Sequence, residues 1–283
     1  MRIALCNEVL AEMPFARQCE FAARLGYDAL EVAPFTLSDH PDAITAAEAR
    51  GFRKTAESFG LSITGLHWLL VKPDGLSLTE PDADVRRRTR AVMSRLTGLC
   101  AELGGRVLVH GSPKQRQIPP GEAPAAALER LKEALAEAGD TAAKQGVTYC
   151  IEPLSRQETP LINTVAEAAD IVRQVGSRGL RTMIDCSAAG LTEIQPVPQL
   201  IRQWVPTGLI GHIQVNDRNR RGPGQGADRF RPVFQALRDS AYGGDIGVEP
   251  FIYEPDGPAC AARCIGYLRG LLEDEGGPPP SRP

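Results

Sequence analysis

The chain has 283 residues, of which 42% are hydrophobic, and it carries a formal net charge of -3 at neutral pH. This length fits either two small domains or one α/β barrel of about 250 residues, and the apolar fraction is ample for one large core. The slight acidic excess disfavours a nucleic-acid or membrane surface, because both usually require a basic excess. No run approaches the roughly 18 apolar residues of a membrane span. The seven scattered cysteines show no CxxC spacing and predict reduced, buried thiols in a cytoplasmic protein.

A repeated unit runs along the chain: an amphipathic segment, then a glycine, then a short β-rich run. Glycine at these places suits the left-handed residue that ends a helix before a strand. Eight strands that alternate with helices favour a parallel sheet, and eight is the number that closes a (β/α)8 TIM barrel. Periodicity alone leaves an open, doubly wound sheet as the alternative. The eight expected strands are 2–6, 29–32, 63–68, 107–110, 149–152, 182–185, 210–212 and 246–249, and the β-rich run of the seventh continues over 212–215.

No linker divides the chain, so we expect one TIM-barrel catalytic domain over 1–272. The remaining segment, 273–283, is acidic and then rich in glycine and proline, which predicts a flexible tail.

Four residues of metal-binding type fall where the later strands are expected to end. They are Glu152, Asp185, His212 and Glu249, assigned to strands five to eight. In α/β barrels, side chains at the carboxyl ends of the strands line the active-site mouth. Buried carboxylates are costly without compensation, and one divalent cation compensates several of them. The alternative is a set of salt bridges to arginines such as Arg156. The oxygen-rich set predicts Mn²⁺, with Co²⁺ or Mg²⁺ as alternatives, over a structural zinc.

The segment that starts at Glu152 (EPLSRQET, followed by Asn163-Thr164) resembles ketose 3-epimerases of the D-tagatose/D-psicose type. These enzymes belong to the xylose-isomerase-like sugar phosphate isomerase/epimerase superfamily. The likeness extends to Ile184-Asp185, to His212 with Arg218 six residues later, and to the stretch 247–251. It covers the barrel in order and is strongest from residue 148 onward.

The resemblance implies a role for each matching residue. Glu152, Asp185, His212 and Glu249 match the family's metal ligands, and Glu152 and Glu249 also match its acid/base pair. Glu158 and Arg218 match residues that hold substrate hydroxyls. The implied reaction removes a proton from the carbon beside a ketone and returns one to the opposite face, through an enediolate, and so inverts C3. The resemblance further implies a sugar substrate and a homodimer or homotetramer.

One position departs from the epimerase pattern. The epimerases carry a histidine three residues after the aspartate ligand, and this chain has Ala188 there. The identity of the sugar is therefore open, and a sugar phosphate or a keto-glycoside is conceivable.

Other residues are weaker candidates for the pocket. His67 and His110 lie at the ends of the third and fourth strands, and each is either a substrate contact or a core histidine. Trp68 is expected either to stack on a sugar or to fill the barrel rim. The basic, glycine-rich loop 218–226 is a candidate phosphate site, because barrels often bind phosphate after strands seven and eight.

Three other functions are alternatives to a sugar epimerase. A lyase or dehydratase acting on a keto-inositol or keto-glycoside would use the same base and metal. An apurinic endonuclease of the same superfamily would need many histidines for its zinc ions, and this chain has four. A non-catalytic sugar-binding protein would be expected to have lost some of the ligands.

Overall fold

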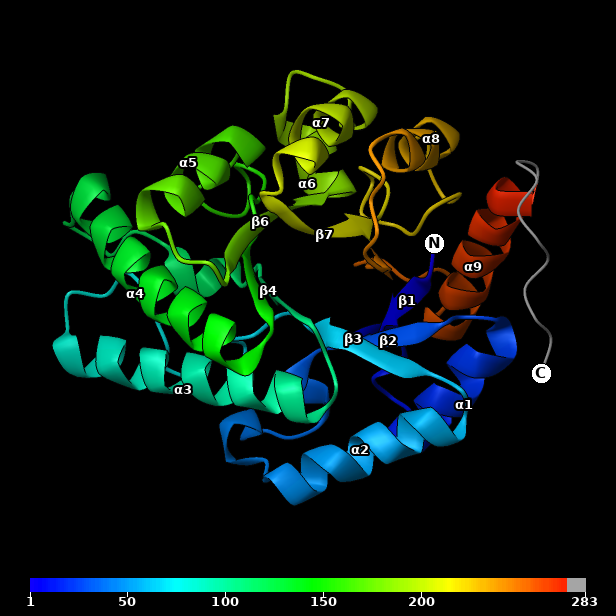
Figure 1. Ribbon diagram of the computed structural model, residues 1–283, viewed down its shortest axis with the longest axis horizontal. Coiled ribbons are helices and arrows are strands. Elements are labelled where there is room, and N and C mark those ends of the chain that lie inside the picture. Colours follow the sequence, from blue (N-terminus) through cyan, green and yellow to red (C-terminus); the bar gives the residue numbers. More distant parts are fainter. Residues whose placement is uncertain (274–283) are drawn as a thin grey trace.

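The computed structural model describes residues 1–273. The tail expected at 273–283 falls outside them, apart from Glu273, which ends α9 (Gly257–Glu273). Eight short strands lie at the centre of the molecule and the helices surround them (Figure 1). The strands are β1 (Ile3–Cys6), β2 (Ala29–Val32), β3 (Ser62–Leu66), β4 (Val107–His110), β5 (Thr148–Ile151), β6 (Leu180–Asp185), β7 (Ile210–Val215) and β8 (Ile246–Val248).

Every strand pairs in parallel with the next one along the chain, and β8 pairs with β1, so the sheet closes into a barrel. The predicted TIM barrel is thereby confirmed, and the open sheet is excluded. The other helices are α1 (Phe15–Leu25), α2 (Ala46–Ser58), α3 (Ala83–Glu102), α4 (Pro124–Gln145), α5 (Val165–Val175), α6 (Cys186–Thr192), α7 (Val197–Trp204) and α8 (Arg231–Asp239).

Local sequence signals set several helix boundaries. Thr45 caps the start of helix α2 and Thr164 that of α5, and each start is a capping box in which the threonine and the glutamate three residues later exchange hydrogen bonds. Helix α1 ends at Gly26, whose φ of 92° lies in the left-handed region. A side chain is strained in that conformation, which accounts for the glycine that precedes β2.

Apolar side chains from the strands and the inner faces of the helices form the main core. A second, smaller cluster (Val107, Val109, Cys150 and Met183) uses the alternate strand positions. Within residues 1–273, no helix is both long enough and apolar enough to span a membrane.

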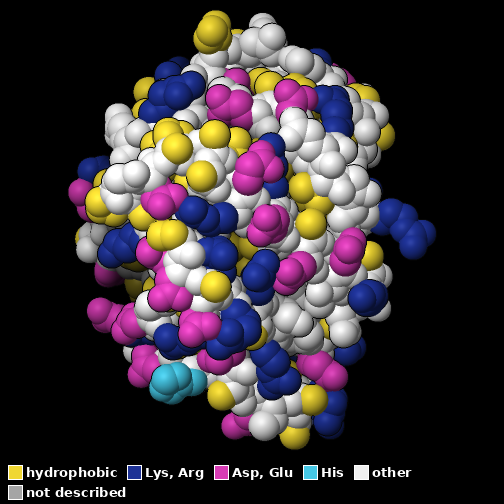
Figure 2. All heavy atoms as spheres, turned by 90° about the vertical axis from the view of Figure 1, so that its left-hand side faces the viewer, with side chains coloured by type: hydrophobic (Ala, Val, Ile, Leu, Met, Phe, Trp, Pro, Cys, Tyr) yellow, Lys and Arg dark blue, Asp and Glu magenta, His cyan; other side chains and the backbone are white. Residues whose placement is uncertain are grey.

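Charges of both signs are interspersed over the face that contains α3 and α4 (Figure 2). The basic run 86–90 on α3 is part of this pattern: Arg87 pairs with Asp84 at 2.7 Å and Arg90 with Glu137 at 3.2 Å. These arginines are therefore neutralised by neighbours on the helices and do not form a basic patch.

The depth of β7 differs from the expectation. The strand continues three residues beyond His212, to Val215. A register shift at Thr182/Met183 aligns His212 with Met183 and Gln214 with Asp185. His212 therefore lies inside the barrel one layer below the mouth, and Gln214 occupies the layer of Asp185.

Candidate metal and active site

Three carboxylates converge at the carboxyl end of the barrel. Glu152 follows β5, Asp185 ends β6 and Glu249 follows β8, and one oxygen of each lies within 4.8 Å of the others. All three side chains are buried. The sequence placed these residues at strand ends, and the fold brings them together.

Burial and repulsion from nearby carboxylates disturb the ionisation of all three groups. Burial is the largest cause in each case. The charges of Glu249 and Asp185 add to it and raise the pKa of Glu152 well above its usual range. The pKa of Asp185 rises to about 8, with Glu249 as the second cause. The pKa of Glu249 rises to about 7, although the hydrogen bond from His67 opposes the rise. Three carboxylates cannot all ionise here unless a cation joins them.

His212 does not belong to this group. Its Nε2 atom lies 2.8 Å from Oε2 of Glu31, a fully buried carboxylate on β2. The sequence-based placement of His212 at the mouth is wrong because β7 continues three residues beyond His212, whose side chain therefore lies in a deeper layer.

Gln214 occupies the position next to Asp185 and was not anticipated as a site residue. Its Nε2 donates to Oε1 of Glu31 at 3.0 Å, which fixes the amide. Its Oε1 is buried without a hydrogen-bond partner among the described residues. A buried carbonyl oxygen needs a partner, and a divalent cation or a water can supply one.

Neighbouring side chains fix the orientation of Glu249. Its Oε1 lies 2.9 Å from Nδ1 of His67 and accepts a hydrogen bond of 2.9 Å from Nε1 of Trp68. Its Oε2 is buried and has no hydrogen-bond partner among residues 1–273. Trp68 adopts a positive φ of 51°, which is uncommon for an aromatic residue. His67 and Trp68 thus hold one oxygen of Glu249 and leave the other available.

His67 also contacts a residue that the sequence did not indicate. Its Nε2 atom lies 3.0 Å from Oε2 of Glu8 in the 3-10 turn Asn7–Leu10. Burial opposes protonation of the ring, but Glu8 and Glu249 raise the pKa of His67 well above its usual value. Ligand atoms of Cys6, Glu8, His67 and Glu249 lie within 4.8 Å of one another, so Glu249 links this cluster to the three carboxylates.

Asp185 has two partners besides its neighbouring carboxylates. It accepts hydrogen bonds of 2.7 Å from the backbone N–H of Ala188 and from Nδ2 of Asn216. Asn216 also donates to the backbone oxygen of Glu249 at 2.9 Å. Ala188 is buried in α6, so the departure from the epimerase pattern lies in the first turn of the helix that Asp185 caps.

Glu158, expected to hold substrate hydroxyls, pairs with Arg220. Its Oε1 lies 3.3 Å from Nη1 of Arg220, and its Oε2 accepts a hydrogen bond of 2.7 Å from the hydroxyl of Ser155. The guanidinium of Arg220 lies over the ring of Phe251, 4.5 Å from its centroid. Glu158, Phe251 and the catalytic candidates line one small cavity together with Trp68, Gly111, Pro113 and Leu154.

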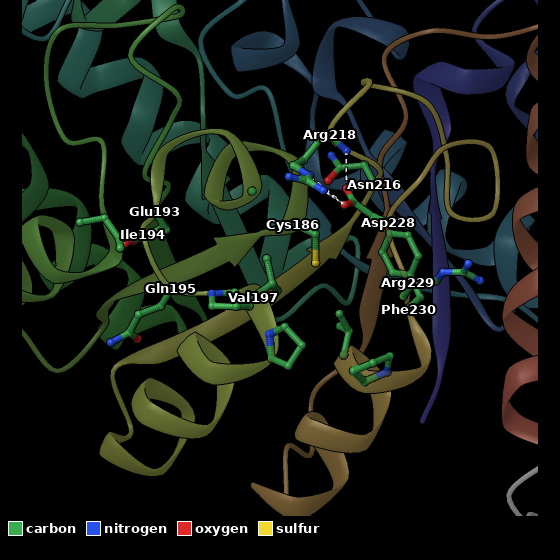
Figure 3. A pocket seen from close by; sticks show the side chains of 15 residues that line it. Cys186, Glu193, Ile194, Gln195, Val197, Asn216, Arg218, Asp228, Arg229 and Phe230 are labelled. Atoms are coloured by element: carbon green, nitrogen blue, oxygen red, sulfur yellow. Dashed lines mark hydrogen bonds and ion pairs between the residues drawn. The ribbon is translucent and has the colours of Figure 1, made fainter.

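Arg218 lies in a different pocket, between α6, α7 and α8 (Figure 3). It forms an ion pair of 2.7 Å with Asp228. The sequence assigned the contact with substrate hydroxyls to Arg218 because it lies six residues after His212, and that spacing was counted from the wrong layer of β7. From the loop 218–226, Arg220 therefore contacts Glu158 and Phe251, which line the cavity of the carboxylates, whereas Arg218 lines the other pocket.

His110 ends β4, and its Nδ1 lies 2.7 Å from the hydroxyl of Tyr149. Burial, reinforced by Arg116, lowers the pKa of His110 to about 3, so the ring is neutral. Its Nε2 has no hydrogen-bond partner among the described residues.

With this geometry established, comparison with known proteins defines the class. Residues 19–270 match the family described as xylose isomerase-like TIM barrel, and the chain belongs to that family. It is 31% identical over 243 residues to a D-psicose 3-epimerase of Agrobacterium fabrum, with 84% of this chain and 80% of that protein covered. It is 27% identical to an L-ribulose 3-epimerase of Mesorhizobium japonicum, with 81% and 73% covered.

A solved structure gives the same picture of the fold. The crystal structure of a D-psicose 3-epimerase in the presence of D-fructose superposes with a TM-score of 0.81 at 24% identity, covering 96% of this chain and 99% of that chain. The curated epimerase relatives confirm the resemblance to ketose 3-epimerases inferred from the sequence.

Proposed function

We propose that this protein is a divalent-metal-dependent ketose 3-epimerase that acts through Glu152 and Glu249. The main observation in support is the convergence of two buried carboxylates, together with Asp185, at the mouth of a closed barrel. The family membership and the epimerase relatives point to the same class of reaction.

The residues present fit a cation. Glu152, Asp185 and Glu249 would hold it, and the orphaned Oε1 of Gln214, in the layer of Asp185, would serve as the fourth ligand in place of His212. Such a set is made of oxygen atoms only, which favours Mn²⁺ or Mg²⁺ over Co²⁺ or Zn²⁺, and Mn²⁺ remains our first choice. When bound, the cation polarises the ketone and stabilises negative charge on the oxygens of the substrate.

Glu152 and Glu249 divide the proton transfer. One removes the proton beside the ketone, and the other returns a proton from the opposite face, so the carbon inverts. His67 and Trp68 hold Oε1 of Glu249 and leave Oε2 to face the substrate. Glu152 needs the space above Gly111, because a Cβ atom there would lie 1.9 Å from its Oε2.

The Glu158–Arg220 pair supplies polar contacts for substrate hydroxyls. Trp68 and Phe251, whose ring centroids are 6.1 Å apart, provide the apolar wall for a sugar ring or chain. A cytoplasmic location and assembly as a homodimer or homotetramer accompany the proposal as expectations from the sequence.

Chromatography tests the proposal. Mn²⁺-loaded protein is incubated with a panel of ketoses, including D-psicose, D-fructose, D-tagatose and L-ribulose, and each product is separated from its 3-epimer. We expect at least one pair to interconvert from both directions, and conversion to cease after chelation of the metal. A panel of neutral and acidic ketoses in which none is converted, with full metal occupancy shown by elemental analysis, would refute the proposal.

A further inference from the structure

Arg116 is the most anomalous charged residue of the barrel. It ends the 3-10 turn Pro113–Arg116 that follows β4, and its side chain is 0% exposed. Nε, Nη1 and Nη2 all lack a hydrogen-bond partner among the described residues. A buried guanidinium with no partner is strongly unfavourable, so the working protein must meet its charge in another way.

The turn that carries Arg116 is fixed in place. The backbone oxygen of Gln115 accepts a hydrogen bond of 2.8 Å from the N–H of Leu78, and that of Arg116 accepts one of 3.4 Å from the hydroxyl of Thr159. Gly111 and Pro113, from the same segment, line the cavity of the carboxylates. The backbone that carries Arg116 is therefore fixed at the catalytic end of the barrel, and the guanidinium lies within electrostatic reach of Glu152 and Glu158.

Two carboxylates act on the charge of Arg116, but both have other partners. Glu158 is held by Ser155 through one oxygen and by Arg220 through the other. Glu152 belongs to the three-carboxylate group that we assign to the cation. Burial lowers the pKa of Arg116 to about 10, while Glu152 and Glu158 raise it, so the group is a cation at neutral pH.

His110 lies within electrostatic reach of Arg116, which helps to lower the pKa of the histidine. The Nε2 atom of this histidine is also buried without a partner among residues 1–273. A planar guanidinium next to a neutral imidazole, both with unused hydrogen-bonding atoms, matches the needs of a small oxyanion.

We propose that Arg116 anchors an anionic group of the substrate, a carboxylate or a phosphate, and that the preferred substrate is therefore an acidic keto sugar. This inference rests on the proposed function and narrows its substrate class. Arg218 and Arg220 do not fit the role, because each already has a carboxylate partner. Among residues 1–273, Arg116 is the fully buried arginine that a charged substrate can neutralise.

The test compares three ligands of matched carbon skeleton: D-fructose, D-fructuronate, which carries a carboxylate at C6, and D-fructose 6-phosphate. Calorimetry on Mn²⁺-loaded protein measures the affinity of each. We expect one acidic ligand to bind about tenfold or more tightly than D-fructose, as a charge-assisted contact in a buried site should. The better of the two acids identifies the anionic group.

Variants show whether a preference for acidic ligands comes from Arg116 or from the attraction of the bound Mn²⁺ for anions. We expect Arg116→Gln to lose the preference for the acid and Arg116→Lys to retain part of it. The control Arg218→Gln changes an arginine that is paired with Asp228 in another pocket, and should keep the full preference. Without ligand, Arg116→Gln should be at least as stable as the parent protein, because it removes an unpaired buried charge.

The outcomes are distinct. Equal affinity of the parent protein for all three ligands would overturn the inference without use of any variant, and so would an acid preference that survives in Arg116→Gln. Marked destabilisation of ligand-free Arg116→Gln would also count against it, because the protein itself would then supply the partner. Epimerisation of neutral ketoses without acid preference would refute only the anchor. Arg116-dependent acid binding without any epimerisation would refute only the proposed function.

Discussion

Replacement of Glu152 by glutamine should weaken catalysis and, at the same time, alter the pH dependence of stability. The change preserves the shape of the side chain but removes its ability to accept a proton. A positioned general acid or base contributes about 10²- to 10⁴-fold to rate, so we expect kcat to fall by at least about 100-fold. Ketose conversion by the metal-loaded variant measures this loss.

The stability effect follows from the raised pKa of Glu152. In metal-free protein the folded state keeps a proton that the unfolded chain releases above about pH 4. The resulting stability is fully present below that pH and is lost as pH rises toward the folded pKa, by about 1.4 kcal/mol per pH unit for each such group. Glutamine removes one of these groups. The loss of stability between pH 5 and pH 7 should therefore be smaller in the variant, by on the order of 2 kcal/mol.

Urea unfolding in EDTA at pH 5 and pH 7 measures the difference. Glu158→Gln is the matched control: its carboxylate lines the same cavity but lies outside the three-carboxylate group, so the pH dependence of its stability should resemble that of the parent. Parent-like turnover in Glu152→Gln, or the same loss of stability as in the parent protein, would refute the reasoning.

Three further predictions follow from the same geometry. Gly111→Ala should lower kcat by about tenfold or more while the fold persists, since the new Cβ meets only the movable end of Glu152; parallel turnover and urea measurements check it, and unchanged kcat would contradict it. Gln214→Leu should weaken Mn²⁺ binding by about tenfold or more, as measured by electron paramagnetic resonance titration; an unchanged dissociation constant would remove Gln214 from the ligand set. Mn²⁺ should raise the melting temperature more at pH 8 than at pH 6, because Asp185 and Glu249, with pKa values of about 8 and 7, must lose protons to bind it. An equal or smaller rise at pH 8 would contradict that linkage.

The features that the sequence predicted well depend on short-range patterns. Helix-ending glycines such as Gly26, and the alternation of helical and β-rich runs, gave the eight strands and hence the barrel. Glu152, Asp185 and Glu249 were placed together because each lies at or directly after a strand end, where a shift of one residue changes little.

The errors concern how deep a side chain lies in the barrel and which residue it pairs with. Both depend on the register between neighbouring strands. The shift between β6 and β7 moves His212 below the mouth and brings Gln214 level with Asp185. The continuation of β7 to Val215 likewise makes Arg220, two residues beyond Arg218, the partner of Glu158. A count of residues from a misjudged strand end cannot reveal these assignments.

Glu8, Glu31 and Arg116 gave no recognisable signal in the sequence. Each is a single charged residue within or after an early strand, and its significance comes from partners more than 30 residues away, such as His67, or from the lack of any partner. Unpaired buried charge is a property of the folded chain. A search for charged residues directly after predicted strands would have found Glu8 and missed Arg116.

The most direct test of the central claim is proton exchange at the inverted carbon. Mn²⁺-loaded protein is incubated in D₂O with a ketose that it converts, and nuclear magnetic resonance follows deuterium at C3. Two carboxylates that act on opposite faces predict that the 3-epimer formed at early times carries deuterium at C3, and that Glu152→Gln and Glu249→Gln each abolish its formation. Inversion that retains the original proton at C3, or that continues in both variants, would contradict the assignment of Glu152 and Glu249 as the acid/base pair.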